Sequence, residues 1–373
     1  MKIKTITCQH VYNYGATLQA YALQNYLESK GHEVEVVDYR LASHIRYELF
    51  TLYPVGRAYK LVCAFPILRY VISPYRNRFM LKTWGRKKAF NAFDKKYLHL
   101  TQQTYRTYDE LKCSGLTADV FIAGSDQIWN PEYENGKDPG YYLDFGDRNA
   151  KRISYAASFG VSALSDEQAQ FVKRQLEHFS HVSVREKAGV EILRKIGVQA
   201  VQCVDPVFLL NREEWIANLG LTVNKDKYIM VYDFNHDNPK MASFVQRLSE
   251  HTGLKILSVN DDSNAYYADI QVNNAGPKEF LEYICNAEFV VASSFHATVF
   301  SLIFKKKFVT YPLSVLSNSS RMENLLDLVG LHERFCCDNI DVIQKNVDWT
   351  NINCLLADYS AKSKEYLHNA VLN

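Results

Sequence analysis

An alternation of apolar strands and helices, separated by short loops, constrains the fold of this chain more than any other feature. Residues 2–8 and 32–39 are rich in β-branched side chains, and the segment between them carries apolar side chains at helical spacing before Gly31. Strand, helix and strand in this order form one βαβ unit, whose crossover places the second strand parallel to the first. The sequence therefore predicts an α/β fold with parallel sheets.

The alternation falls into two series. The predicted strands of the first are 2–8, 32–39, 119–123, 152–157, 181–184 and 200–204, and those of the second are 228–232, 255–259, 289–292 and 307–310. A chain of 373 residues is also longer than one hydrophobic core usually supports. We predict two Rossmann-like domains that face across a cleft, residues 1–205 and 206–373, with the last helix, about 353–367, a candidate to pack back on the first domain.

The charge of the chain is uneven. A formal net charge of +2 argues against a general nucleic-acid binder, but residues 41–100 hold 12 basic and two acidic residues. We expect this segment to be a basic helical excursion from the first domain. Within it, residues 49–72 interleave aromatic, apolar and basic side chains. Two interpretations remain open: peripheral contact with an anionic membrane, or helices packed on the first domain with their charges in water.

Several site classes have no support in the sequence. The cysteines form no CxxC pair, and no His, Asp or Glu cluster has the spacing of metal ligands, so we predict no metal and no tightly bound cofactor. The first residues lack the apolar core of a signal peptide, and no stretch is long and apolar enough to span a membrane. These features predict a cytoplasmic location.

Polar residues that follow the predicted strands are the candidate ligand contacts, because open parallel sheets bind ligands at the carboxyl ends of their strands. The clearest run follows residues 289–292, where Ser293, Ser294, His296 and Thr298 open a helix. Helix N-termini bind phosphate and carboxylate, and histidine can donate, accept or carry a proton. The alternative is that the serines only cap the helix and the histidine lies in the core.

Two other strand ends carry candidates. Arg185 follows residues 181–184, and its guanidinium suits a carboxylate or phosphate, although a salt bridge to Glu186 or Glu191 is the alternative. The loop after residues 119–123 combines polar side chains with an indole and could bind a sugar. The alternative is an ordinary turn with Trp129 in the core. Its candidates are Ser125, Asp126, Gln127 and Trp129. The remaining candidates are Asn13, Gly15, Ser158, Asp233, Asn235 and Arg321, the last either an anion ligand or a residue on a solvated helix face.

The ordered motifs resemble the polysaccharide pyruvyl transferase family. They are NYGATLQAYAL at Asn13, FIAGSDQIWN at Phe121, ISYAASFG at Ile153, VSVRE at Val182, VDPVFLL at Val204, ASSFHATVFSLIF at Ala292 and SSRMENLL at Ser319. The resemblance implies a fold like that of two-domain GT-B glycosyltransferases, and phosphoenolpyruvate handling by His296 and Arg185. Some relatives have Arg-Leu-His where this chain has Ser294-Phe295-His296, so that arginine is absent here.

The function that the resemblance implies is transfer of a pyruvyl group from phosphoenolpyruvate, as co-substrate, to a sugar or oligosaccharide. The acceptor is expected on the first domain, with Asp126 as the best carboxylate for its hydroxyl, and a lipid-linked acceptor would suit the basic segment. The product, expected to be a cyclic ketal, with an enolpyruvyl ether or an ester as the alternatives, would belong to a bacterial-type cell-surface or capsular polysaccharide. Two alternatives remain: a GT-B glycosyltransferase that uses a nucleotide sugar, and a non-catalytic polysaccharide-assembly protein.

Overall fold

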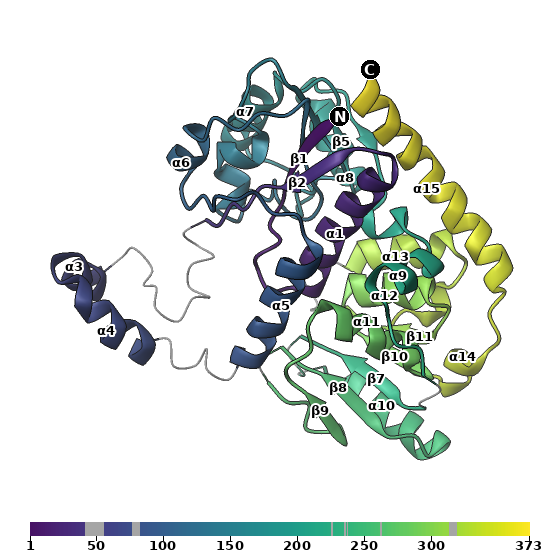
Figure 1. Ribbon diagram of the computed structural model, residues 1–373. Coiled ribbons are helices and arrows are strands. Elements are labelled where there is room, and N and C mark those ends of the chain that lie inside the picture. The colour runs from purple at the N-terminus through teal and green to yellow at the C-terminus, as the bar shows by residue number, and fades with distance from the viewer. Residues whose placement is uncertain are drawn as a thin grey trace. The chain divides into compact units, whose positions relative to one another are not determined.

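The computed structural model describes residues 1–41, 56–76, 83–224, 227–234, 236, 238–261, 263–312 and 319–373 (Figure 1). The chain divides into two compact units. Unit 1 comprises Met1–Lys82, Asp94–Leu209 and Ser360–Asn373, and unit 2 comprises Thr83–Phe93 and Leu210–Tyr359. The helix expected at the carboxyl terminus contributes its last part to unit 1, and Thr83–Phe93, from the basic segment, belongs to unit 2.

Unit 1 is built on a parallel sheet with the strand order β2-β1-β3-β4. Its strands are β1 (Lys2–Ile6), β2 (Glu33–Val36), β3 (Val120–Ala123) and β4 (Lys151–Ser154). The short parallel strands β5 (Ser183–Val184) and β6 (Val201–Gln202) continue this arrangement, because isolated bridges join Ile153 to His181 and Ala157 to Val184. All six strands predicted for the first series are present.

The helices of unit 1 include α1 (Tyr14–Ser29), α6 (Tyr108–Lys112), α7 (Asp166–Leu176) and α8 (Lys187–Lys195). Side chains cap the N-termini of three of them, α1, α6 and α7. The side chain of Asn13 accepts from the first-turn amides of α1, and Gly31, two residues beyond the helix, has a φ of +84° that suits glycine. Because the strands are parallel, their carboxyl ends lie at the same edge of the sheet, and the candidate residues of unit 1 follow these ends.

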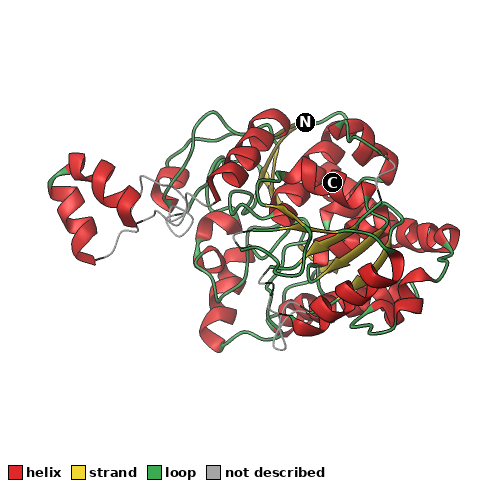
Figure 2. Ribbon diagram, turned by 90° about the horizontal axis from the view of Figure 1, so that it is seen from below, coloured by secondary structure: helices red, strands yellow, loops and turns green. Residues whose placement is uncertain are grey.

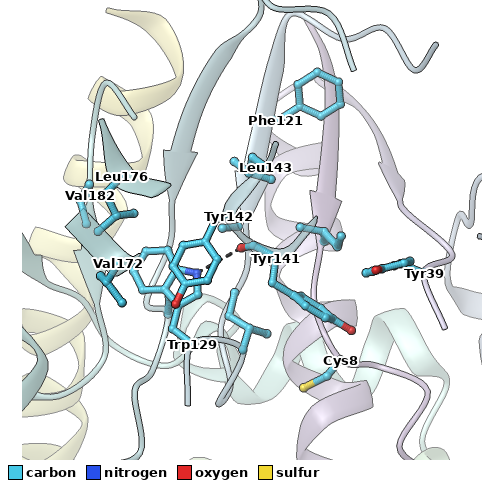
Figure 3. Close-up of a cluster of buried hydrophobic side chains, with 14 of the residues drawn as sticks. Cys8, Tyr39, Phe121, Trp129, Tyr141, Tyr142, Leu143, Val172, Leu176 and Val182 are labelled. Atoms are coloured by element: carbon cyan, nitrogen blue, oxygen red, sulfur yellow. Dashed lines mark hydrogen bonds between the residues drawn. The ribbon is translucent and has the colours of Figure 1, made fainter. Parts of the chain in front are cut away.

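The core of unit 1 is unusually aromatic (Figure 3). Trp129 stacks on Tyr142 with ring centroids 5.3 Å apart, and its indole Nε1 donates to the carbonyl oxygen of Tyr141 at 3.1 Å. Phe121, from β3, packs edge-on against Phe145. Because these rings come from the loop after β3 and the chain that follows, they fix the shape of that loop from beneath.

Unit 2 is built on a five-stranded parallel sheet with the order β11-β10-β7-β8-β9. Its strands are β7 (Ile229–Tyr232), β8 (Ile256–Val259), β9 (Ile270–Val272), β10 (Phe289–Ala292) and β11 (Lys307–Thr310). The central strands are buried along their whole length, as their apolar sequences predict. The short edge strand β9 was not predicted, because Ile-Gln-Val lacks a continuous apolar run and is partly exposed.

The helices of unit 2 include α9 (Arg212–Leu219), α10 (Pro239–Thr252), α11 (Pro277–Asn286), α12 (Phe295–Ile303), α13 (Ser319–Leu328) and α14 (Ile340–Gln344). Of these, α10, α11 and α12 lie between successive strands of the sheet; Figure 2 shows the helices and strands of the chain by colour. The parallel α/β class predicted from the sequence is confirmed in both units.

The remaining helices lie in the basic segment and at the carboxyl terminus. They are α3 (Gly56–Ala64), α4 (Arg69–Arg76), α5 (Trp84–Tyr97) and α15 (Trp349–Leu372). Residues 42–55 and 77–82 of the predicted basic excursion lie outside the described residues. The last part of α15 is bonded within unit 1, where the Tyr366 hydroxyl donates to the Ser154 carbonyl at 3.1 Å. None of the helices in the described ranges has the length and apolarity that crossing a membrane requires.

Candidate functional site

The turn after β3 presents Asp126 in a strained backbone conformation. Asp126 has a φ of +70°, and Ala156, at the end of the neighbouring β4, has a φ of +52°. Left-handed conformations are costly for residues other than glycine, and such strain concentrates at functional sites. The Asp126 side chain remains 20% exposed, although its neighbour Ser125 is fully buried. A carboxylate that reaches solvent from a rigid, buried turn is a suitable contact for a substrate hydroxyl.

The thiol of Cys8, at the end of β1, supports Asp126. Its Sγ donates to the Asp126 Oδ2 atom at 3.6 Å. Burial, followed by the negative charge of Asp126, raises the pKa of Cys8 well above its ordinary value. Cys8 is therefore a neutral hydrogen-bond donor to the carboxylate, and its environment opposes the thiolate that a nucleophilic cysteine needs.

Arg185, at the end of β5, is surrounded by carboxylates. Its Nη1 lies 2.6 Å from Asp205 Oδ2, its Nε lies 2.9 Å from Glu186 Oε1, and its Nη2 lies 3.9 Å from Asp126 Oδ1. Burial would lower the pKa of Arg185, but the charges of Glu186, Asp205 and Asp126 raise it above its ordinary value. The salt bridge to Glu186, considered from the sequence, is present and belongs to a larger network.

This network, which we call the Arg185 cluster, has more negative than positive charge. Its members are Arg185, Asp126, Glu186 and Asp205, with Ser158 donating to Glu186 Oε1 at 3.0 Å. Three carboxylates facing one guanidinium would repel a phosphate or carboxylate ligand. The cluster suits a ligand rich in hydroxyl groups instead. The contact of Arg185 with phosphoenolpyruvate, which the resemblance implied, stays a prediction, and the carboxylates around the guanidinium weigh against it.

A second charged group in unit 1 was missed by sequence reasoning. His10 is buried with its Nε2 2.6 Å from Asp38 Oδ1 and its Nδ1 3.4 Å from Asp94 Oδ2. Burial lowers the pKa of His10, but its contacts with Asp38 and Asp94 outweigh this and raise it. His10 and Asp38 follow β1 and β2, so the strand-end rule could have found them. Asp94 comes from α5, and no local pattern predicts that it reaches this site.

The His10 cluster predicts a pH-dependent stability. Because the folded pKa of His10 is raised, its interactions stabilise fully below the unfolded value of about 6.5 and are lost as the pH rises through the folded pKa. We expect His10→Gln to lower the free energy of unfolding by about 1.5–3 kcal/mol near pH 6, with a smaller difference at higher pH. Urea unfolding followed by circular dichroism from roughly pH 6 to pH 9 measures this difference.

His99→Gln provides the matched control, because His99 pairs with Glu28 at an exposed position. This variant should have little effect at any pH, since exposed pairs contribute little. A constant stability difference for His10→Gln across the pH range would show that the imidazole is not charged in the folded protein.

In unit 2, the start of α12 brings together three of the predicted residues. Ser294 occupies the N-cap position, and its side chain makes no capping hydrogen bond. His296, in the first turn, packs edge-on against Phe295 with centroids 5.4 Å apart. The Arg321 guanidinium lies 5.5 Å from the centroid of the same Phe295 ring. Arg321 is thus positioned beside the α12 N-terminus.

Asp233, at the end of β7, is the buried acid of unit 2. Ser293 Oγ donates to its Oδ1 at 2.7 Å, while its Oδ2 is buried without a hydrogen-bond donor among the described residues. Tyr267 lies nearby: burial first, and then the charge of Asp233, raise its pKa. Asn235, also predicted as a contact, lies outside the described residues.

Other predicted contact residues have structural roles. Trp129 is fully buried in the core, Ser125 donates to the carbonyl of Ala156, and Thr298 hydrogen-bonds the buried Thr310 hydroxyl and the Ser294 carbonyl. These three side chains are buried and bonded within the protein, so their prediction as substrate contacts has no support from their surroundings. Asn13 caps α1, where Gly15 donates to it, and Gln127 accepts from Asn130.

Neither unit offers a grouping of three or more His, Cys, Asp or Glu side chains that could hold a metal ion, within the described ranges.

Comparison with protein families identifies the chain. Its sequence matches the family model described as polysaccharide pyruvyl transferase over residues 13–314, which is most of its length. The chain belongs to this family. The resemblance seen in the ordered motifs is confirmed, and family membership supports a transferase that acts on a sugar or polysaccharide. A comparison with curated proteins gives no match.

Solved structures of low sequence identity resemble this family member. An alpha-glucosyltransferase in complex with UDP and DNA is 9% identical, with full coverage of both chains and a TM-score of 0.53. The UDP-GlcNAc 2-epimerase from Methanocaldococcus jannaschii is 12% identical, covering 92% of this chain and 91% of its own, with a TM-score of 0.45. At this sequence identity, the likeness to the glucosyltransferase is evidence for a shared fold and for nothing more. It confirms the GT-B-like architecture predicted from the sequence.

Proposed function

We propose that this protein transfers the pyruvyl group of phosphoenolpyruvate to sugar hydroxyls and forms a cyclic ketal on a polysaccharide precursor. The observation that supports this most directly is the start of α12, where a histidine, an arginine and a helix N-terminus lie together. These are the groups that a small ligand with two anionic ends requires.

The donor is assigned to unit 2. Phosphoenolpyruvate carries a phosphate and a carboxylate, so its site needs positive charge and N–H donors. Arg321 provides the charge, and the first-turn amides of α12 provide donors aligned with the positive end of the helix dipole. His296 lies in the same turn and is our candidate for the group that transfers a proton to or from the donor.

The reaction balances without a further reagent. The methylene carbon of phosphoenolpyruvate gains a proton and becomes a methyl group, while a sugar hydroxyl loses its proton and bonds to the adjacent carbon. A second hydroxyl then displaces phosphate from that carbon and closes the ketal, so its proton leaves with the phosphate. The step needs one acid and one base, and correct placement of each contributes about 10²- to 10⁴-fold.

The acceptor is assigned to unit 1. Asp126 is the candidate base, because its carboxylate is partly exposed and its position is fixed by the strained turn, by Cys8 and by the Arg185 cluster. Arg185 is a positioning residue in this scheme: its guanidinium holds Asp126, Glu186 and Asp205 in place. An acidic surface with hydroxyl and carboxylate groups suits a sugar or oligosaccharide.

A nucleotide-sugar glycosyltransferase is the second candidate function. The buried Oδ2 atom of Asp233 has no hydrogen-bond donor among the described residues, and a ligand hydroxyl, such as that of a ribose, would supply one. The third candidate, a non-catalytic assembly protein, would bind neither donor.

Thermal unfolding with each donor separates these candidates. Phosphoenolpyruvate at about 100 times its Kd should stabilise the protein by about 2.7 kcal/mol, whereas a nucleotide sugar should have no effect. Arg321→Gln should weaken phosphoenolpyruvate binding about 10- to 100-fold, because a charge-assisted contact is lost. Arg247→Gln, at an exposed position on α10, is the matched control and should bind as the wild type does.

The result distinguishes all three functions. Stabilisation by UDP-sugars alone would favour the glycosyltransferase, and stabilisation by neither donor would favour an assembly role.

A further inference from the structure

The helix pair in the basic segment has an unusual charge composition. We call residues 56–76, which contain α3 and α4, the α3–α4 hairpin; Figures 1 and 2 both show its helices side by side. This stretch contains four basic residues and no acidic residue. Arg57 and Lys60 lie on the exposed side of α3, and Arg69, also exposed, opens α4. Nothing within the hairpin neutralises these charges.

On α4 and in the turn before it, apolar and aromatic side chains are exposed to solvent while a polar one is buried. Ser73 is fully buried, and its hydroxyl has no hydrogen-bond partner in the described chain. Val71 and Tyr75, one helical turn apart, are 69% and 71% exposed, and Ile67 in the preceding turn is 78% exposed. A helix in water normally buries its apolar side chains and exposes its polar ones. Ser73, Ile67, Val71 and Tyr75 do the opposite.

We propose that the α3–α4 hairpin docks the protein on an anionic membrane surface. Ile67, Val71 and Tyr75 enter the boundary between headgroups and acyl chains, and Arg57, Lys60 and Arg69 bind the lipid phosphates. The long basic side chains allow their charges to stay at headgroup level while the helix surface is buried. Ile67, Val71 and Tyr75, which are exposed to water in the free protein, would then be buried at the edge of the acyl chains.

Charge complementarity favours lipid over another copy of this chain. A dimer formed through the hairpin would bring two surfaces together that each carry basic residues and no acidic ones, and these would repel. Anionic lipid headgroups supply the missing negative charge. The proposal goes beyond the proposed function and does not depend on it, because vesicle binding can be measured without donor or acceptor.

Flotation of the full-length protein with vesicles tests the proposal. We expect binding to phosphatidylcholine vesicles that contain phosphatidylglycerol, weak binding to phosphatidylcholine alone, and loss of binding at high salt. Arg57→Gln with Lys60→Gln should weaken binding on the order of 30-fold, since each basic residue contributes roughly 5-fold. Ile67→Asp with Val71→Asp should weaken it by at least about 10-fold.

Two matched controls carry the same chemical changes elsewhere on the surface. Lys173→Gln with Lys195→Gln removes two exposed basic residues from α7 and α8, and Val201→Asp with Val223→Asp changes two exposed valines. Both should bind vesicles as the wild type does. Equal binding to neutral and anionic vesicles, or no binding to either, would overturn the proposal. So would a loss of self-association in the hairpin variants without vesicle binding, since that would identify a second copy as the partner.

Discussion

Replacing His296 with alanine should lower kcat by about 10²- to 10⁴-fold while leaving the fold intact. His296 is only partly buried, and its contact with Phe295 is an edge-on ring contact, so its loss removes little packing. The expected loss is in the chemical step, because the imidazole is assigned to proton transfer at the donor. Turnover at saturating donor and acceptor concentrations, measured beside a thermal unfolding curve, gives both quantities.

His251→Ala is the matched control, because His251 is exposed near the end of α10 in the same unit. Its kcat should equal that of the wild type. If His296→Ala kept nearly wild-type turnover, the assignment of proton transfer to His296 would fail. If it unfolded at a much lower temperature instead, the histidine would be a structural residue of the core, the alternative left open by the sequence.

Arg185→Met should destabilise unit 1 by about 3–5 kcal/mol, because it removes the guanidinium that pairs with the buried carboxylate of Asp205 and with Glu186. The guanidinium is 4% exposed, and Asp205, its partner at 2.6 Å, is fully buried. Methionine preserves much of the side-chain volume, so packing should contribute little to the loss. The unfolding midpoint should fall on the order of 10 °C for a domain of this size.

A double-mutant cycle separates charge from packing. Asp205→Asn in the Arg185→Met background removes one unpaired buried charge, so the double variant should be more stable than Arg185→Met alone. An Arg185→Met protein of normal stability with a raised KM for phosphoenolpyruvate would contradict the account. Arg185 would then be a donor ligand, as the family resemblance implied.

The sheets and their order along the chain could be predicted from the sequence because the information is local. Apolar strands such as 228–232 and 289–292 are buried over their whole length, and Gly31 follows α1 where a left-handed residue is required. Asp126, Arg185 and His296 could be selected because each follows the carboxyl end of a predicted parallel strand, where open sheets bind their ligands. Periodicity and cap residues carry this information within a few neighbouring positions.

The adjacent partner Glu186 of Arg185 was among the predictions, but partners that come from distant segments could not be predicted. Asp205 reaches Arg185 from the end of β6, and Asp94 reaches His10 from α5. The burial of individual side chains could not be predicted either. Trp129 lies in a polar-aromatic loop that resembles a sugar-binding platform, but in the structure it stacks on Tyr142 in the core. Whether a polar or aromatic residue at a strand end faces a ligand or the core depends on packing that the local sequence does not specify.

Phosphate release from phosphoenolpyruvate across a panel of sugar and oligosaccharide acceptors, with mass spectrometry of the product, tests the central claim most directly. The account predicts that phosphate release depends on an acceptor with a pair of neighbouring hydroxyls. It also predicts that the product mass increases by one pyruvate less one water, and that His296→Ala suppresses both signals. Acceptor modification by a nucleotide sugar, with no phosphate released from phosphoenolpyruvate under any condition, would contradict it.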